Sequence, residues 1–203
     1  MSTIGVCQAM TARRAVKGFD PSHQFSDEEK KQLFTHAFLA PTAFNIQHWR
    51  VVNVEERELR AKIREQAWNQ PQVTDASLLL VLCMDVNAWR KKPERYWQGV
   101  PQPVQDFILP KIHDYYHGKP QVQRDECFRS CGILAMSLML IAGDMGYESC
   151  PMDGFDFDAV GKLIRLPQDH IIGMMVAIGK GITEPHPRVG KLPLSEVLIS
   201  NHF

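Results

Sequence analysis

The 203-residue sequence lacks several features that mark large protein classes. It contains no G-x-G-x-x-G and no G-x-x-x-x-G-K-[ST], so the usual dinucleotide and nucleotide phosphate loops are absent. The N-terminus, MSTIGVCQAMTARR, has neither the basic start nor the long apolar core of a signal peptide. The longest apolar run, CGILAMSLMLIAG from Cys131, is too short to span a bilayer, which favours a buried helix and no membrane partner.

An excess of one charge and a disulfide framework are also missing. Lys+Arg and Asp+Glu number 23 each, so no overall field attracts nucleic acid and any anion site must be local. The five cysteines are an odd, scattered set, which predicts a reducing, cytoplasmic location. His113 and His117 have helical ligand spacing but no evident third ligand, so we expect no metal site. At the same spacing, Cys127 and Cys131 are expected to be small buried hydrophobic residues.

The length and the 44% share of hydrophobic residues predict one substantial domain over residues 1–203. Helical patterns are found at about residues 3–16, 26–39, 55–68, 106–118, 125–146 and 155–166. Ser26 precedes Glu29 at the spacing of a capping box, Asp156 is an expected N-cap, and Gly146 is an expected C-terminal cap.

Strand composition is found at residues 49–54, 77–85 and 170–181, and a strand-like piece ends the Pro-rich tail. Residues 77–85 are apolar almost throughout, which predicts a central strand covered on both faces. Residues 86–120 are the least regular part and contain several aromatic side chains, which predicts either a lid or channel wall or ordinary core or dimer contacts. The order of elements lacks the regular alternation of a doubly wound sheet.

Two basic or polar segments could hold a ligand. In RRAVKGF, Arg13 and Lys17 are four apart, so on a continuing helix they would share a face and could grip a phosphate, or form a solvated basic face. In APTAFNIQHW, Asn45 and Gln47 each offer a donor and an acceptor on one plane, which suits the polar edge of a flat ring. Such residues after a helix can equally satisfy local backbone groups.

Two further segments are weaker on their own. In CPMDGFD, Gly154 would let a backbone N–H approach a ligand without a side chain intervening, although an ordinary turn explains the segment equally well. In RVGKLP, Arg188 and Lys191 form a basic pair that alone predicts only a solvated loop.

Taken in order, RRAVKGF, APTAFNIQHW, CPMDGFD and RVGKLP resemble the motifs of the FMN-dependent nitroreductase family, from about residue 10 to the C-terminus. The resemblance implies an α+β fold, a three-layer sandwich with a mixed, mainly antiparallel sheet flanked by helices. It also implies an intertwined homodimer with FMN at the interface, in which the tail, about residues 182–203, reaches over the partner subunit.

The resemblance assigns FMN contacts to four groups of residues. The phosphate and the polar ring edge would be held by basic side chains and their neighbours, and the ring edge also by amides. The backbone of Asp153 and Gly154 would face flavin N5, and residues 42–47 would reach the partner's flavin. The implied cofactor-binding residues are Arg13, Arg14, Ala15, Lys17, Pro41, Thr42, Ala43, Asn45, Gln47, Asn69, Gln72, Pro151, Met152, Asp153, Gly154, Arg188 and Lys191.

The implied activity is an NAD(P)H oxidoreductase that reduces nitroaromatics, quinones or activated enones by ping-pong hydride transfer through flavin N5, with no catalytic side chain. The sequence departs from the family pattern at Ala15, Ala43, His48 and Gln72, where Ser, Ser, Pro and sometimes Lys are usual. The alternatives are a non-catalytic FMN-binding or storage protein, a family member with specialised reductive chemistry, and a helical interaction module without a cofactor.

Overall fold

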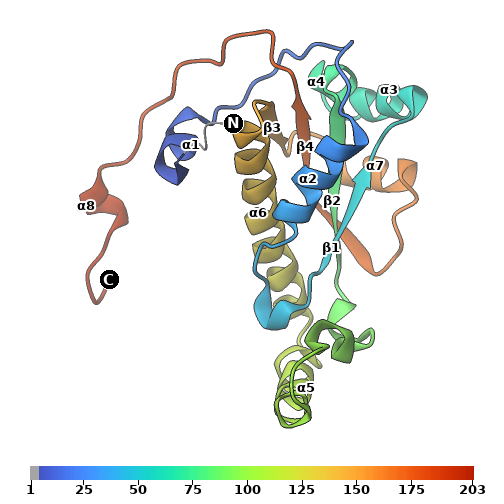
Figure 1. Cartoon of the computed structure of the whole chain (residues 1–203), viewed down its shortest axis with the longest axis vertical. Helices are drawn as coiled ribbons and strands as arrows, with labels where there is room; N and C mark the ends of the chain where they lie inside the picture. Colours follow the sequence, from blue (N-terminus) through green and yellow to red (C-terminus); the bar gives the residue numbers. More distant parts are fainter. Residues whose placement is uncertain (1–4) are drawn as a thin grey trace.

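The computed structural model describes residues 5–203 and is built around a four-stranded sheet (Figure 1). The strands are β1 (Trp49–Asn53), β2 (Leu78–Asp85), β3 (Glu148–Met152) and β4 (His170–Gly179). They lie in the order β1-β2-β4-β3, and all three pairings are antiparallel. Helices cover both faces of this sheet, so the predicted three-layer α+β architecture is confirmed.

One face of the sheet packs against α2 (Asp27–Ala37) and α6 (Pro120–Asp144). The even-numbered side chains of β2, from Leu78 to Met84, point to this side and join a cluster with Leu33, Cys131 and Leu134. Most of the helical side chains in this cluster come from α6, including Leu134 and Leu138, whereas α2 buries only Leu33 and Ala37 among its described residues.

The other face packs against α3 (Arg57–Glu65), α4 (Gln72–Asp75) and α7 (Phe157–Leu163). The odd-numbered side chains of β2, Leu79, Val81 and Cys83, point to this side and contact Ile63 and Val160 in a second cluster. All eight residues of β2 are buried. The apolar run at 77–85 is therefore a central strand covered on both faces, as predicted.

Residues 86–120 form a separate end piece made of η2 (Ala88–Arg90), η3 (Pro93–Trp97) and α5 (Gln102–Tyr116) (Figure 1). Tyr116, Ile112 and Trp89 are buried in a third cluster with Ile46. Phe107 is 65% exposed. The aromatic side chains of this region thus divide between core contacts and an exposed face on α5.

The predicted helix ends agree with the structure at three positions. Ser26 and Glu29 form the reciprocal hydrogen bonds of a capping box at the start of α2. Asp156 accepts a hydrogen bond from the backbone N–H of Ala159 at 2.9 Å and so caps α7. Gly146 has φ +83° directly after α6, the left-handed conformation that a C-terminal glycine supplies.

Two predictions about elements are wrong, and one strand was missed. The first helix, α1 (Val6–Ala12), ends at Arg13 and does not continue to residue 16; its predicted start, residues 3–4, lies outside the described residues. Residues 194–197 of the tail form a short helix, α8 (Leu194–Val197), and no strand. Strand β3 was not predicted at all, because its sequence ESCPM reads as a loop.

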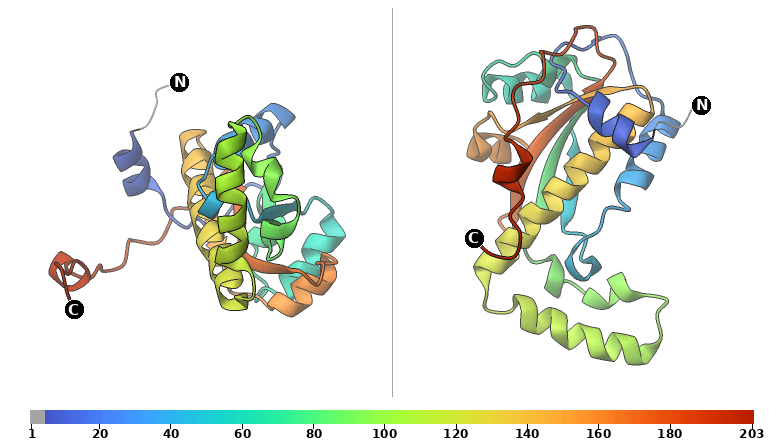
Figure 2. Two further views of the ribbon diagram at one scale, coloured as in Figure 1. Left: turned by 90° about the horizontal axis from the view of Figure 1, so that it is seen from below. Right: turned by 90° about the vertical axis from the view of Figure 1, so that its left-hand side faces the viewer.

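Helix α6 is the one helix in the described part of the chain that is long and apolar enough, by length and composition, to cross a membrane. Nine of its residues, including Leu134 and Leu138, are buried within the chain. Because that face packs against β2, β3 and β4, α6 is the core helix that the sequence predicts. Figure 2 shows the C-terminal tail extending away from this body, whereas α1 contacts α6.

Candidate functional site

The segment after α1 is an extended strand-like piece that lies beside β3. Ala15 forms a parallel bridge with Ser149, and the Val16 N–H donates to the Ser149 carbonyl at 3.1 Å. Val16 and Phe19 are buried, which fixes the segment on the sheet and explains why the helix cannot continue. Arg13 and Lys17 therefore do not share a helical face; they belong to an extended chain, in which alternate residues point the same way.

The beginning of the C-terminal tail lies against the same segment. The Arg188 guanidinium donates to the carbonyl oxygens of Thr11 and Arg13 at 3.0 and 2.9 Å, and Arg14 donates to the carbonyl of His186. The structure thus brings Arg188 to the RRAVKGF segment, whereas Lys191 is simply exposed.

These basic groups are not neutralised by the protein. Among residues 5–203, the side chains of Arg13, Arg14, Lys17 and Arg188 form no ion pair with a carboxylate. Burial raises the pKa of the Cys150 thiol, and the positive charges of Lys17 and Arg13 oppose that shift. The result is a local anion-attracting region in a chain without net charge.

A chain of amides runs from this region toward Gly154. Gln72 is fully buried, and its Nε2 lies 3.9 Å from Cys150 Sγ and donates to Gln70 Oε1 at 2.9 Å. Gln70 in turn donates to the Gly154 carbonyl at 3.1 Å. The Oε1 atom of Gln72 is buried without a hydrogen-bond partner among the described residues. An unsatisfied buried acceptor of this kind is costly unless a donor reaches it.

Trp68 is a site residue that the sequence analysis did not single out. Its indole is 79% exposed and lies so close to Gly154 that a Cβ there would be 2.6 Å from the ring. Trp68 and the exposed Asn69 both have φ of +52°, a conformation that Asn adopts readily but that is uncommon for a residue as bulky as Trp. Such strain persists only where the surroundings hold it, so the placement of the indole over Gly154 is imposed by the fold.

The rest of the CPMDGFD segment leads into this region along β3. Pro151 and Met152 form the end of β3, in register with Val176 and Met175 of β4. Asp153 follows and is exposed.

The APTAFNIQHW segment forms a tight turn that includes η1 (Ala43–Asn45). Phe44, Asn45 and Gln47 all have positive φ, between 50° and 56°. Thr42 Oγ1 accepts from the Gln47 N–H at 3.0 Å, and Asn45 Nδ2 donates to the Tyr96 carbonyl at 3.0 Å. Some of these polar groups therefore satisfy local partners. In the same turn, Pro41 is exposed and Ala43 is half-buried.

The structure does not bring this turn together with the basic segment. Trp49, which follows the turn, pairs with Met84 at one end of β2. Ser149, beside the basic segment, pairs with Ile178, and Ile178 pairs with Leu78 at the other end. Six positions along β2 correspond to about 20 Å. One chain therefore carries two separate groups of predicted ligand-binding residues, which Figure 1 shows at opposite ends of the sheet.

His48, directly after the turn, is completely buried. Its ring lies 3.3 Å from Ser130 Oγ on α6 and 3.5 Å from Tyr116 Oη on α5. Burial lowers the pKa of His48 to about 4, so the imidazole is neutral at physiological pH. The turn at residues 42–47 is therefore fixed to α5 and α6 by an uncharged polar contact.

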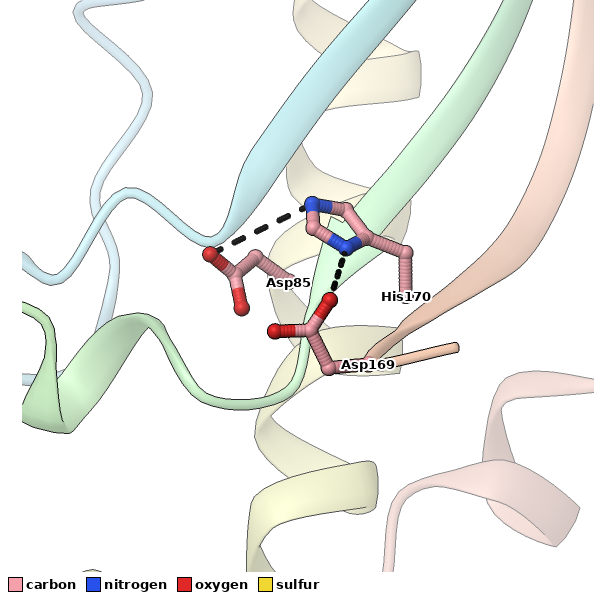
Figure 3. Close-up of side chains that lie close together, drawn as sticks. All are labelled: Asp85, Asp169 and His170. Carbon is pink, nitrogen blue, oxygen red and sulfur yellow. Dashed lines mark hydrogen bonds and ion pairs between the residues drawn. The ribbon is translucent and has the colours of Figure 1, made fainter. Parts of the chain in front are cut away.

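Asp85, Asp169 and His170 form a second cluster of ionisable groups at the end of the sheet near η2 (Figure 3). His170 Nδ1 lies 2.7 Å from Asp169 Oδ1 and its Nε2 lies 4.0 Å from Asp85 Oδ2. The Lys91 ammonium already bridges the two carboxylates, at 2.8 and 2.7 Å. Hydrogen bonds from Lys91 and His170 lower the pKa of Asp169. Through these contacts Lys91 ties residues 86–91 to the sheet. Its ammonium also occupies the position between the two carboxylates that a metal ion would need.

The comparison with known proteins agrees with this architecture. The sequence model of a protein family, described as the nitroreductase family, matches residues 10–180 of this chain. Protein DrgA of Synechocystis is 48% identical over 196 residues, covering 94% of this chain and 93% of that protein. MhqN of Bacillus subtilis, provisionally named an NAD(P)H nitroreductase, is 30% identical, with coverage of 91% and 93%. A nitroreductase-like protein of Exiguobacterium sibiricum, solved in complex with FMN, is 26% identical, has a TM-score of 0.90 and gives 98% coverage of both chains.

The chain belongs to the nitroreductase family.

Proposed function

We propose that this protein is an FMN-dependent NAD(P)H oxidoreductase that works as a homodimer and reduces electron-poor acceptors such as nitroaromatics, quinones or activated enones. The FMN complex of the related structure and the name of MhqN support the cofactor and the reductant. When bound, FMN supplies hydride chemistry at N5. The free thiols of this chain suit a reducing cytoplasm.

The observation that carries the proposal is the separation of the two polar groups along the sheet. Arg13, Lys17 and Gln72 lie near the end of the sheet at Leu78, and the 42–47 turn precedes β1 at the end near Met84. Gly154 follows Met152, which is level with Val81 in the middle of β2. A second copy of the chain can bring its turn to the first copy's basic segment, which one copy alone does not do. The tail, with exposed apolar side chains such as Leu194 and Leu198, would cover the partner subunit.

The residues present fit FMN. The unpaired cations Arg13, Arg14 and Lys17 would bind the phosphate, with Arg188 and Lys191 adding charge from the tail. The amides of the exposed Asn69 and of Gln72, which is buried beside Cys150, would pair with the ring's polar edge. From the second copy, Thr42, Asn45 and Gln47 would orient the ring.

No side chain in this arrangement needs to act as a nucleophile or a general acid. The protein's contribution is to hold the ring, place cations where negative charge develops and keep one face open to the acceptor. The exposed Trp68 indole, beside Gly154, is positioned to border that open face. A planar acceptor would gain contact area against it.

The test is to replace Arg13 and Lys17 together with Ala and measure FMN retention after gel filtration. We expect the double variant to lose most of its flavin, while a matched double variant at the remote, exposed Lys31 and Arg124 keeps it. Full retention in the Arg13/Lys17 variant contradicts the phosphate assignment. Anaerobic mixing of the wild type with NADPH or NADH should bleach the flavin absorption; an unresponsive yellow protein would indicate flavin storage instead.

A further inference from the structure

A cavity of about 320 Å³ lies between the loop at residues 21–25, α2, the start of α3 and the end of α4. It contains none of the residues assigned to FMN. Helix α4 separates the two regions: Gln72 is turned toward Cys150 on β3, whereas Thr74 and Ala76 line the cavity. Any ligand in this cavity would therefore be additional to the flavin.

The cavity is polar and carries an excess of positive charge. Its charged walls are Lys30, Arg57 and Arg60 against one carboxylate, Glu55, and His23 adds an imidazole. Glu55 is already occupied, since its Oε1 accepts from Lys30 at 3.1 Å and from Asn53 Nδ2 at 2.8 Å. Two of the three cations, Arg57 and Arg60, are therefore left without a carboxylate partner.

Arg60 is the deepest of these cations, with only 8% of its surface exposed. It donates three hydrogen bonds, to the carbonyl oxygens of Val54, Ala76 and Ser77. A guanidinium has five N–H groups, so two remain for another acceptor. No carboxylate lies within ion-pair distance of Arg60 in residues 5–203, and burial lowers its pKa. A buried charge in this state is costly unless an anion compensates it.

Arg57 lies one helical turn before Arg60, at the start of α3. It is exposed and makes no ion pair or side-chain hydrogen bond with any other described residue. A guanidinium can present two parallel N–H groups to one oxyanion, so Arg57 is available to bind an anion beside Arg60.

From these observations we infer that the cavity binds a phosphate group, held by Arg60 at its base and by Arg57 and Lys30 at its mouth. Lys30, Arg57 and Arg60 outweigh Glu55 in the cavity wall, and a phosphate dianion would neutralise this excess of positive charge. The volume of the cavity also leaves room for a larger molecule that carries the phosphate. The two possible sources are inorganic phosphate and a phosphate monoester. The inference does not depend on the proposed redox activity, because the flavin residues and these residues do not overlap.

The experiment is isothermal titration of the dimer with inorganic phosphate, in phosphate-free buffer at constant ionic strength and with saturating FMN, so that a flavin phosphate site is already filled. We expect saturable binding that Arg57→Gln weakens about tenfold, the effect of losing one charge-assisted contact. Glu55→Gln should tighten binding, because it removes the only carboxylate of the cavity. Lys62→Gln, an equal loss of charge on the same helix outside the cavity, should leave binding unchanged.

Two results would overturn the inference: no binding of phosphate to the wild type at millimolar concentration, or equal weakening by Arg57→Gln and Lys62→Gln. A parallel titration with adenosine monophosphate separates the sources. Tighter binding of the ester than of inorganic phosphate, sensitive to Arg57→Gln, identifies a phosphorylated metabolite as the ligand. Equal or weaker binding of the ester identifies inorganic phosphate. Because Arg60 also supports three backbone carbonyls, its replacement is left out of the test.

Discussion

Acidification should destabilise this protein through His48, well above the pH at which its carboxylates are protonated. The imidazole is buried among groups of both signs: the carboxylates of Glu126 and Asp85 favour its protonated form, and Arg50 opposes it. Desolvation outweighs these charges and lowers the pKa from 6.5 to about 4. In the unfolded chain the ring is solvated and takes up a proton near its ordinary pKa.

The sign and size of the effect follow from linkage. Between pH 6.5 and pH 4 the unfolded state binds a proton that the folded state does not, so stability falls as the pH falls. For a pKa of about 4 in the folded state and 6.5 in the unfolded state, the loss between pH 7 and pH 5 is about 2 kcal/mol. The full effect, reached below pH 4, is about 3.4 kcal/mol.

Urea unfolding of the FMN-saturated protein at fixed protein concentration, at pH 7, 6 and 5, measures this loss. His48→Gln keeps a polar, uncharged side chain, so its stability should fall about 2 kcal/mol less than that of the wild type over the same interval. His36→Gln, at an exposed position on α2, is the matched control and should behave as the wild type does. If His48→Gln and the wild type lose the same stability between pH 7 and pH 5, the reasoning is refuted.

Three other substitutions test local features of the fold. Gly173→Ala should destabilise the protein by about 1–3 kcal/mol in urea unfolding, because its Cβ would lie 2.2 Å from Cys131 Sγ; adding Cys131→Ala should restore part of the loss, and no rescue would contradict the clash. Gly154→Ala should push Trp68 aside, seen as a change in tryptophan emission, and an unchanged spectrum would show that the indole does not rest there. Ser26→Ala removes the cap of α2 and should cost about 1 kcal/mol, whereas a change within measurement error would contradict the capping role.

The sequence predicts those elements whose signal is local. The run at residues 77–85 was predicted as a doubly covered strand because a central strand can be apolar at every position, and all eight residues of β2 are buried. The capping box at Ser26 is equally local, since both partners lie within four residues.

The failures come from long-range partners. Strand β3 contains Pro151, which argues against a central strand; the structure places β3 at the sheet edge, where proline is tolerated. The first helix stops at Ala12 because Val16 and Ala15 pair with Ser149, more than 130 residues away in the chain. No local pattern reports such a pairing.

The candidate site shows the same contrast between residues that a local motif identifies and residues that depend on long-range partners. The motif residues of RRAVKGF and RVGKLP are close in space, since Arg188 contacts the carbonyls of Thr11 and Arg13. Trp68 was missed because a single exposed aromatic residue after a helix has no periodic signal, and its left-handed backbone cannot be read from its side chain. The roles assigned to the 42–47 turn stay predictions, because one chain shows only their local hydrogen bonds.

The strand order β1-β2-β4-β3 has a consequence for synthesis on the ribosome. The inner position next to β2 belongs to β4, which is made after α6 and β3. At about 5–20 residues per second, the nascent chain carries α6, whose hydropathy resembles that of a membrane helix, for seconds before residue 179 is added. During those seconds β4 is incomplete, so the sheet cannot form and cover α6. We therefore expect newly made chains to expose the apolar face of α6 until β4 is added, and truncations within β4 to accumulate as aggregates and not as shortened folded proteins.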